Sequence, residues 1–322
     1  MRTLTWIAAG LATIVALTGA ARAADDYPAR PVRIIVGFGP GATIDVTARV
    51  LAPKLGQALG QQFVVENRTG AGSNLAADFV AQAPKDGHTL LVGTIANTIN
   101  ASLGQKLNHD FAKDFAPIAL VATVPNILVV HPSTGVKSVD DLIKLARAKP
   151  DALSYGSAGA GTALHLSAEL FKVMTGTKMV HVPYAGSNQA AADLLTGRVQ
   201  VMFSPASTIL PHVREGKLIA LASTQLKRAS VAPELPTMAE AGLPGFDTSV
   251  WSGLLAPAGT PREAVDKLAR AINEALRSRD VIEPLQKQGI DILGGTPEEF
   301  AAYIQSEIAK WSRVAVAAGL KK

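Results

Sequence analysis

Two glycine-rich segments contain the residue types best suited to bind a small anion. Residues 37–45 read Gly-Phe-Gly-Pro-Gly-Ala-Thr-Ile-Asp after the run Arg-Ile-Ile-Val at 33–36, and residues 156–162 read Gly-Ser-Ala-Gly-Ala-Gly-Thr after Leu153-Ser-Tyr155. Each segment precedes apolar residues at helical spacing, so each predicts a turn from a buried strand into a helix. Because a helix N-terminus offers free N–H groups and the positive end of a dipole, both turns predict anion sites built from backbone.

The first turn admits several interpretations. The phosphate loop of nucleotide triphosphatases requires Gly-Lys-Ser/Thr, and this chain has Ala-Thr-Ile at 42–44, which excludes it. Residues 37–42 fit the dinucleotide fingerprint G-x-G-x-x-A, with Glu66 closing the next apparent strand, although Pro40 removes one amide from the turn. The turn also fits a carboxylate-capture loop, in which Thr43 or Asp45 caps the helix or orients a water. An ordinary tight turn is the remaining alternative.

Catalytic constellations are weak in this sequence. The serine at 157 lies among glycines but lacks the first glycine of G-x-S-x-G, and Asp45 and Glu66 have no evident acid/base partner. The six histidines are dispersed without metal-ligand spacing: His88, His109, His131, His165, His181 and His212. We therefore expect no metal and no enzyme, with a secreted dehydrogenase or hydrolase as the alternative.

The N-terminus predicts export. Arg2 precedes an uncharged apolar run from Trp6 to Ala21, and Ala-Arg-Ala at 21–23 suits a signal-peptide processing site, so we expect cleavage near Ala23 and a periplasmic protein. An exported dehydrogenase would need a cofactor that the cytoplasm normally retains, so we expect no cofactor. There is no cysteine, which excludes disulfides, thiolate metal sites and a lipid-anchored N-terminal cysteine. The formal charge of +5 comes from scattered Lys and Arg residues and aromatics are 5% of the chain, so no nucleic-acid partner is expected.

Strand-like and helix-like segments alternate along the chain, as in an α/β protein. The run 118–131 is long for one strand and has Pro125 in its middle, so we expect it to leave one sheet and enter another. This predicts a two-domain clamshell resembling type II periplasmic binding proteins, with mostly parallel sheets flanked by helices and crossing strands as the hinge. The predicted division is a signal peptide over 1–23, a first domain over 24–124 and 250–322, a second domain over 125–249, and a ligand cleft between them. Polar strand ends at Thr94, Asn97 and Ser204 are expected to face that cleft.

A set of ordered motifs extends over nearly all of the chain after the leader. The motifs are Tyr27-Pro-x-Arg-Pro31, Gly39-Pro40-Gly41-x-Thr43-x-Asp45, Val65-Glu66-Asn67-Arg68, Asp86-Gly87-His88-Thr89-Leu90, Lys113-Asp114-Phe115-x-Pro117-Ile118, Tyr155-Gly156-Ser157 through Thr162, Val182-Pro183-Tyr184-x-Gly186 and Leu254-Leu-Ala-Pro-x-Gly-Thr-Pro261. In these motifs the chain resembles the solute receptors of tripartite tricarboxylate transporters, also called Bug receptors.

The resemblance implies a receptor that holds a small mono- or dicarboxylate, with a plain or aromatic skeleton, between two closing domains. It implies a two-subunit membrane permease or a sensor kinase as a transient partner, and we expect a monomer. The expected ligand-binding residues are Phe38, Gly39, Pro40, Gly41, Thr43, Asp45, Thr94, Asn97, Ser157, Gly159, Gly161, Thr162, Tyr184 and Ser204. Many relatives have proline where this chain has Gly39, and aspartate where it has Ser204. The second departure disfavours an α-amino acid, whose ammonium group that aspartate could meet.

Overall fold

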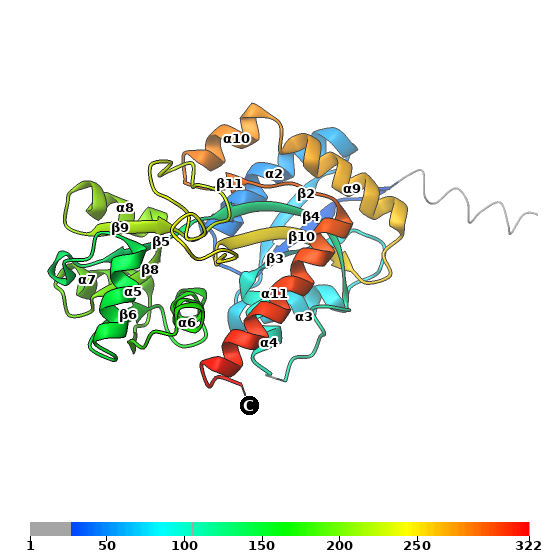
Figure 1. Ribbon diagram of the computed structural model, residues 1–322. Coiled ribbons are helices and arrows are strands. Elements are labelled where there is room, and N and C mark those ends of the chain that lie inside the picture. Colours follow the sequence, from blue (N-terminus) through cyan, green and yellow to red (C-terminus); the bar gives the residue numbers. More distant parts are fainter. Residues whose placement is uncertain (1–26, 105, 322) are drawn as a thin grey trace, which may run out of the picture.

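The protein contains two β-sheets, each flanked by helices (Figure 1). The computed structural model describes residues 27–104 and 106–321, and the predicted signal peptide with its cleavage site lies outside these ranges. The sheets give a working division into a first lobe, 27–124 with 250–321, and a second lobe, 125–249. Of the helices in the described ranges, none combines the length and the hydropathy needed to cross a bilayer.

The first sheet has the strand order β11-β4-β10-β3-β1-β2. Its strands are β1 Val32–Val36, β2 Phe63–Asn67, β3 Thr89–Thr94, β4 Phe115–Val124, β10 Val250–Pro257 and β11 Asp291–Ile292. The strand β1 pairs in parallel with β2 and β3, and β10 runs antiparallel to β3 and β4. The carboxyl ends of β1, β2 and β3 therefore meet at one edge, where the first glycine-rich turn lies.

The second sheet has the order β7-β6-β8-β5-β9. Its strands are β5 Asn126–Val130, β6 Ser154–Ser157, β7 Val180–Pro183, β8 Val201–Pro205 and β9 Ile219–Ser223. The strands β6, β7 and β8 are parallel, whereas β5 is antiparallel to both of its neighbours. Both sheets are thus mixed rather than mostly parallel, because β5 and β10 enter directly from the other lobe without the helical crossover that parallel pairing requires.

Ten α-helices cover these sheets in the described ranges. They are α2 Thr43–Leu59, α3 Asn74–Ala81, α4 Ile95–Ser102, α5 Val139–Ala148, α6 Ala163–Thr175, α7 Ser187–Leu195, α8 Ala206–Arg214, α9 Arg262–Ala275, α10 Arg279–Gln286 and α11 Pro297–Ala317. The helix α2 ends at Gly60, whose φ of 74° suits a left-handed C-cap. A capping box starts α11, since the side chains of Thr296 and Glu299 each accept a hydrogen bond from the other residue's backbone amide.

The chain crosses between the lobes where Pro125 separates β4 from β5, as the interrupted apolar run predicted. It returns through residues 224–249, which carry no helix or named strand. The helix α11 contacts β4 and α4 in the first lobe and α6 in the second (Figure 1). One core cluster likewise includes Ile99 and Trp311 from the first lobe together with Tyr155 and Phe171 from the second. Apolar packing, in addition to the crossing strands, therefore joins the lobes.

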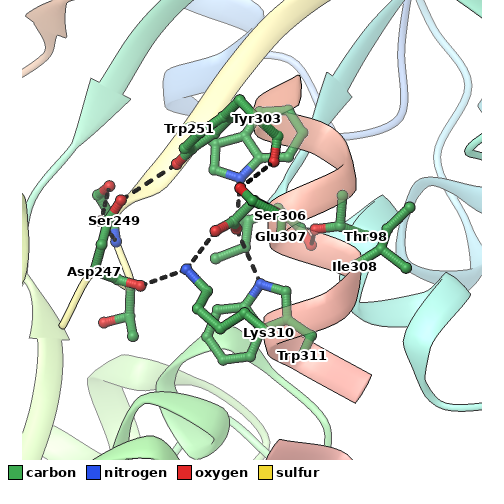
Figure 2. Close-up of polar contacts among 12 residues, drawn as sticks. Thr98, Asp247, Ser249, Trp251, Tyr303, Ser306, Glu307, Ile308, Lys310 and Trp311 are labelled. Carbon is green, nitrogen blue, oxygen red and sulfur yellow. Dashed lines mark hydrogen bonds and ion pairs between the residues drawn. The ribbon is translucent and has the colours of Figure 1, made fainter. Parts of the chain in front are cut away.

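A buried carboxylate fastens α11 to the returning chain (Figure 2). The indole N–H groups of Trp251 and Trp311 each donate to Oε2 of Glu307 at 3.0 Å. The ammonium of Lys310 pairs with Glu307 and donates to the carbonyl oxygen of Asp247 at 2.6 Å. Because Glu307 is only 2% exposed, these donors compensate for burying its charge.

Candidate functional site

The first glycine-rich turn, residues 37–42, leads from β1 into α2 and leaves that helix uncapped. The N-cap residue is Ala42, which has no side-chain oxygen to accept from the first helical amides. The first amide bonded back along the helix is that of Val46, which donates to the Ala42 carbonyl at 2.9 Å. The N–H groups of residues 43–45 have no acceptor among the residues that the structure describes, so they are available to an anion.

Open space borders the same turn. A methyl group built at Gly39 or Gly41 would meet no atom within 4 Å, and Pro40 is exposed. Gly41 has a φ of +81°, which other residues rarely adopt. The carbonyl oxygen of Phe38 already accepts a hydrogen bond from Nδ2 of Asn67 at 2.9 Å. A hydrogen bond from Asn67 thus holds the turn, and open space borders it at Gly39 and Gly41.

Asp45 lies behind the turn and not in the open space. It is 1% exposed and accepts from the Gly41 amide at 2.9 Å, from Asn67 Nδ2 at 2.8 Å and from Arg49 Nε at 3.0 Å. Burial would raise the pKa of Asp45, but the bonds from Arg49, Gly41 and Asn67 outweigh it and hold the pKa below the ordinary value. Asp45 and the Gly41 amide are bonded to each other in this conformation, and their contact with a ligand stays a prediction.

The second turn is also bonded internally. The Ser157 hydroxyl oxygen accepts from the Gly159 amide at 3.1 Å, and the Thr162 hydroxyl donates to the Gly159 carbonyl at 2.7 Å. The Gly161 amide donates to Nδ1 of His165 at 3.1 Å. The amides of Gly159 and Gly161 are thus bonded within the second lobe, and their role in ligand binding stays a prediction. At the start of α6, the amides of positions 163 and 164 have no acceptor in the described residues.

Two stacked imidazoles support the second turn from inside the lobe. The ring centroids of His165 and His181 lie 4.0 Å apart, and Tyr155 stacks on His181 at 4.9 Å. Nε2 of His181 lies 2.6 Å from the Ser157 hydroxyl oxygen. Burial lowers the pKa of His165 to about 4 and also lowers the pKa of His181. Both rings are consequently neutral near pH 7, as the acceptor role of His165 Nδ1 requires.

The close pair of Ser157 and His181 raises the question of a nucleophile and its base. Ser157 has no exposed surface, and its oxygen is already bonded to the Gly159 amide. A hydroxyl buried in this way cannot reach a substrate, so the pair fixes the turn. This arrangement does not support the hydrolase alternative.

The dinucleotide alternative requires a free acidic side chain at Glu66, and this carboxylate is already paired. Glu66 receives two hydrogen bonds from the guanidinium of Arg33, at 2.5 and 2.6 Å, which lower its pKa. A ribose hydroxyl would have to compete with that bidentate pair. Within residues 27–104 and 106–321, no group of three or more His, Asp or Glu side chains has the arrangement of a metal site.

The helix α4 connects the surroundings of the two turns. The loop 70–73 packs against Gly37 of the first turn, and Asn100 of α4 donates to the Gly72 carbonyl at 3.0 Å. At the C-terminal end of α4, which also carries Asn100, Leu103 Cδ1 lies 3.5 Å from the position that a Cβ of Gly161 would occupy. The second turn therefore borders the C-terminal end of α4, and the loop 70–73 links that end of the helix to the first turn.

Two expected strand-end residues, Thr94 and Asn97, form the cap of α4, and the expectation that they face a ligand cleft stays a prediction. The Thr94 hydroxyl accepts from the Ala96 amide at 3.2 Å, and Asn97 Oδ1 accepts from the Thr94 amide at 3.0 Å. Neither residue has exposed surface. This capping box starts α4, a helix that the sequence reading missed. Its signal is Thr-x-x-Asn at the end of an apolar strand.

The remaining expected residues occupy the second lobe. The Tyr184 hydroxyl donates to Oδ2 of Asp193, a residue of α7, at 2.8 Å. Ser204, at the end of β8, is fully buried, and its hydroxyl has no partner in the described ranges. The structure thus gathers 38–45 at one helix start and 157–162 with Tyr184 at another, and places Thr94, Asn97 and Ser204 beneath the surface.

Four residues that hold the turns were not singled out from the sequence. They are Arg49, Asn67, His165 and His181. The spacing of Asp45 with Arg49, and of Gly161 with His165, is four residues, the separation that places groups on one helix face. That spacing is the signal that could have found two of them.

Comparison with known proteins agrees with this architecture. The family described as "Tripartite tricarboxylate transporter family receptor" matches residues 47–320. The structure titled R. palustris Rpa4515 with adipate is 40% identical, covers 91% of this chain and 98% of its own, and has a TM-score of 0.73. MatC from Rhodopseudomonas palustris with bound malate is 34% identical, covers 89% of this chain and 99% of its own, and has a TM-score of 0.70.

A third solved structure carries the name of the receptor group suggested by the sequence motifs. The periplasmic binding protein BugD is 31% identical, covers 92% of this chain and all of its own, and has a TM-score of 0.69. These matches confirm the resemblance and the two-sheet α/β fold. The chain belongs to the tripartite tricarboxylate transporter receptor family, whose members are periplasmic solute-binding proteins.

Proposed function

We propose that this protein captures a small aliphatic dicarboxylate between its two lobes in the periplasm. The observation that carries this proposal is the uncapped N-terminus of α2, whose N–H groups at 43–45 have no acceptor in the described residues, beside open space at Gly39 and Gly41. A carboxylate is the group that such amides complete. Two relatives with bound dicarboxylates, adipate and malate, support the same ligand class.

The second lobe supplies a matching helix start. Thr162 caps α6 through the amide of His165 at 3.4 Å, and the amides of 163 and 164 remain available. A dicarboxylate can place one carboxylate on α2 and the other on α6 when the lobes close. Each charge-assisted hydrogen bond contributes about 1.5–3 kcal/mol, so three or four bonds support micromolar affinity after the cost of closure.

Recognition by backbone amides also explains how the proposed site can bind a carboxylate without an unpaired Lys or Arg side chain. Among the described residues bonded to either turn, Arg49 is the only cation, and Asp45 neutralises it. The specificity of such a site comes from geometry and ordered water more than from charge. Ligand delivery to a two-subunit membrane permease, or to a sensor kinase, is the partner role that fits this receptor family.

The test is a thermal-shift and calorimetry series on the mature chain. Adipate and malate are compared with adipamide, which keeps the carbon skeleton without charge, and with NAD. We expect adipate or malate to raise the melting temperature and bind at one site, because a ligand of the native state stabilises it. A shift with adipamide equal to that with adipate, or with NAD alone, would contradict the proposal.

A further inference from the structure

The two chain segments that join the lobes are paired up to the point where they leave the first sheet. Val124 at the end of β4 pairs with Val250 at the start of β10, and this pair is the last of the β4–β10 ladder. The chain leaves Val124 through Pro125 into β5, and it reaches Val250 from Thr248 through Ser249. A single residue on each segment therefore lies between the first sheet and the next contact of the two segments.

The side chain of Asn126 makes that next contact. Its Nδ2 donates to the Thr248 carbonyl oxygen at 3.1 Å. The Thr248 amide donates to the Thr224 carbonyl oxygen at 3.1 Å, and the Thr224 amide donates to the Asn126 carbonyl oxygen at 2.9 Å. These bonds close a ring through Asn126, Thr224 and Thr248, here called the crossing ring. All three residues are at most 1% exposed, so water does not compete for the bonds.

The crossing ring is bonded to both lobes. In the second lobe, Asn126 begins β5 and Thr224 follows β9, the strand that pairs with β5. In the first lobe, Nζ of Lys310 on α11 donates at 2.6 Å to the Asp247 carbonyl oxygen, which belongs to the same peptide group as the Thr248 amide (Figure 2). A group that both lobes hold moves less than either lobe when they rotate, so the ring has the position of a pivot.

The residues beside the ring can turn without breaking a bond between the two segments. The side-chain ring of Pro125 fixes φ, so ψ is the torsion that remains to this residue. Its carbonyl oxygen accepts from the Ala206 amide at 3.0 Å, which attaches the following peptide group to the second lobe. The Ser249 amide and hydroxyl both donate to Oδ1 of Asp247, at 3.1 and 2.7 Å, within their own segment.

From these contacts we propose that the lobes rotate about the crossing ring, with Pro125 and Ser249 as the bending residues. Asn126 is the positioning residue, because its amide keeps the two segments together during the rotation. Without that amide the Thr248 carbonyl oxygen would stay buried without a side-chain donor, and the segments would be free to separate. The pivot itself is independent of the ligand, and only its effect on adipate affinity rests on the proposed function.

Distances between spin labels on the two lobes test the pivot. The chain has no cysteine, so Lys144→Cys on α5 and Arg279→Cys on α10 introduce the labelling sites, at side chains 73% and 90% exposed. In this background, Asn126→Leu should broaden the distance distribution measured without ligand by pulsed electron paramagnetic resonance, because the lobes lose their fixed axis. It should also weaken adipate binding about fivefold, since fewer molecules hold the lobes in the binding orientation.

Two further variants locate the effect. Pro125→Ala frees φ at the bending residue and should also broaden the ligand-free distribution. Asn273→Leu is the matched control, because Nδ2 of Asn273 donates to the Gly295 carbonyl oxygen at 2.9 Å within the first lobe. This control should lower the melting temperature and leave the distribution as in the wild type. Melting curves establish that each variant is folded.

The ligand-free distances decide the proposal by themselves. Distributions in Asn126→Leu and Pro125→Ala that match the wild type would refute the pivot, and so would equal broadening in Asn273→Leu. A wild-type protein that binds neither adipate nor malate would contradict the proposed function instead, while the ligand-free distances would still test the pivot.

Discussion

Nδ1 of His165 accepts the Gly161 amide at 3.1 Å, which ties the second turn to an imidazole buried inside the lobe. His181 stacks on that imidazole at 4.0 Å and bonds Ser157 at 2.6 Å, so one aromatic pair holds both ends of the turn. In the proposed site His165 is therefore a positioning residue, because its imidazole orients the turn.

The first prediction concerns ligand affinity. His165→Leu removes the acceptor and should weaken adipate binding about fivefold, the equivalent of one net hydrogen bond. His165→Asn, whose amide oxygen can accept, should recover part of the loss. Calorimetry with a melting curve for each variant separates this effect from unfolding. Equal affinity in His165→Leu and the wild type would show that the turn does not need the imidazole.

The second prediction concerns the stability of the protein at acidic pH. The pKa of His165 is about 4 in the folded protein and ordinarily 6.5, so below pH 6.5 the unfolded chain binds a proton that the native chain does not. Stability should therefore be fully present above pH 6.5 and fall as the pH drops toward 4, by up to about 3 kcal/mol from this group. Chemical denaturation at pH 7, 5.5 and 4.5 measures the slope.

The matched variant for the acid experiment is His165→Asn, which cannot titrate. Its stability should depend less on pH over the same interval, with the residual slope arising from groups such as His181, whose pKa is also lowered. A slope identical to that of the wild type would mean that His165 is not neutral and buried in solution.

Much of this fold follows from local sequence signals. Strand 33–36, its glycine-rich turn and the apolar stripe of α2 agree with one another, and the Pro125 interruption predicts the crossing between sheets. No helix was predicted at α4, α8 or α10, each of eight or nine residues. Pro211 and Pro284, which lie inside two of them, also argue locally against a helix.

The sequence predicted which two segments form the turns of the candidate site, but not which amides in them are free. Glycine patterns identified both turns correctly as helix starts. The free amides are those without a hydrogen-bond acceptor in the fold. The Gly41 amide donates to Asp45, and the Gly161 amide donates to His165. The bonds that Asn67 and His181 add come from other strands, and only tertiary packing brings them to the turns.

The third prediction tests the support of the first turn. Asp45→Asn keeps the shape of the side chain but weakens its bonds to Gly41 and Arg49, so stability should fall by about 1–3 kcal/mol and adipate affinity by about tenfold. Asp280→Asn is the matched control, because the Asp280 side chain is 74% exposed whereas that of Asp45 is 2% exposed. If both variants behave like the wild type, Asp45 does not organise the turn.

The fourth prediction addresses the attachment of α11. Glu307→Gln removes the charge that pairs with Lys310 and accepts from Trp251 and Trp311, and should cost about 3 kcal/mol of unfolding free energy. The two tryptophans make fluorescence a local reporter, so the emission should change with the variant. Glu298→Gln, at a side chain 61% exposed, should change stability by less than about 1 kcal/mol. Equal effects of the two substitutions would contradict the role given to Glu307.

The most direct test of amide recognition is to give α2 a cap of its own. Ala42→Asp places a carboxylate on the free amides of 43–45, and Ala42→Asn places a neutral acceptor there. Calorimetry with adipate should show affinity reduced more than about tenfold in Ala42→Asp, while the ligand-free protein becomes more stable by about 1 kcal/mol. Undiminished adipate affinity in both variants would show that the ligand does not bind at the start of α2.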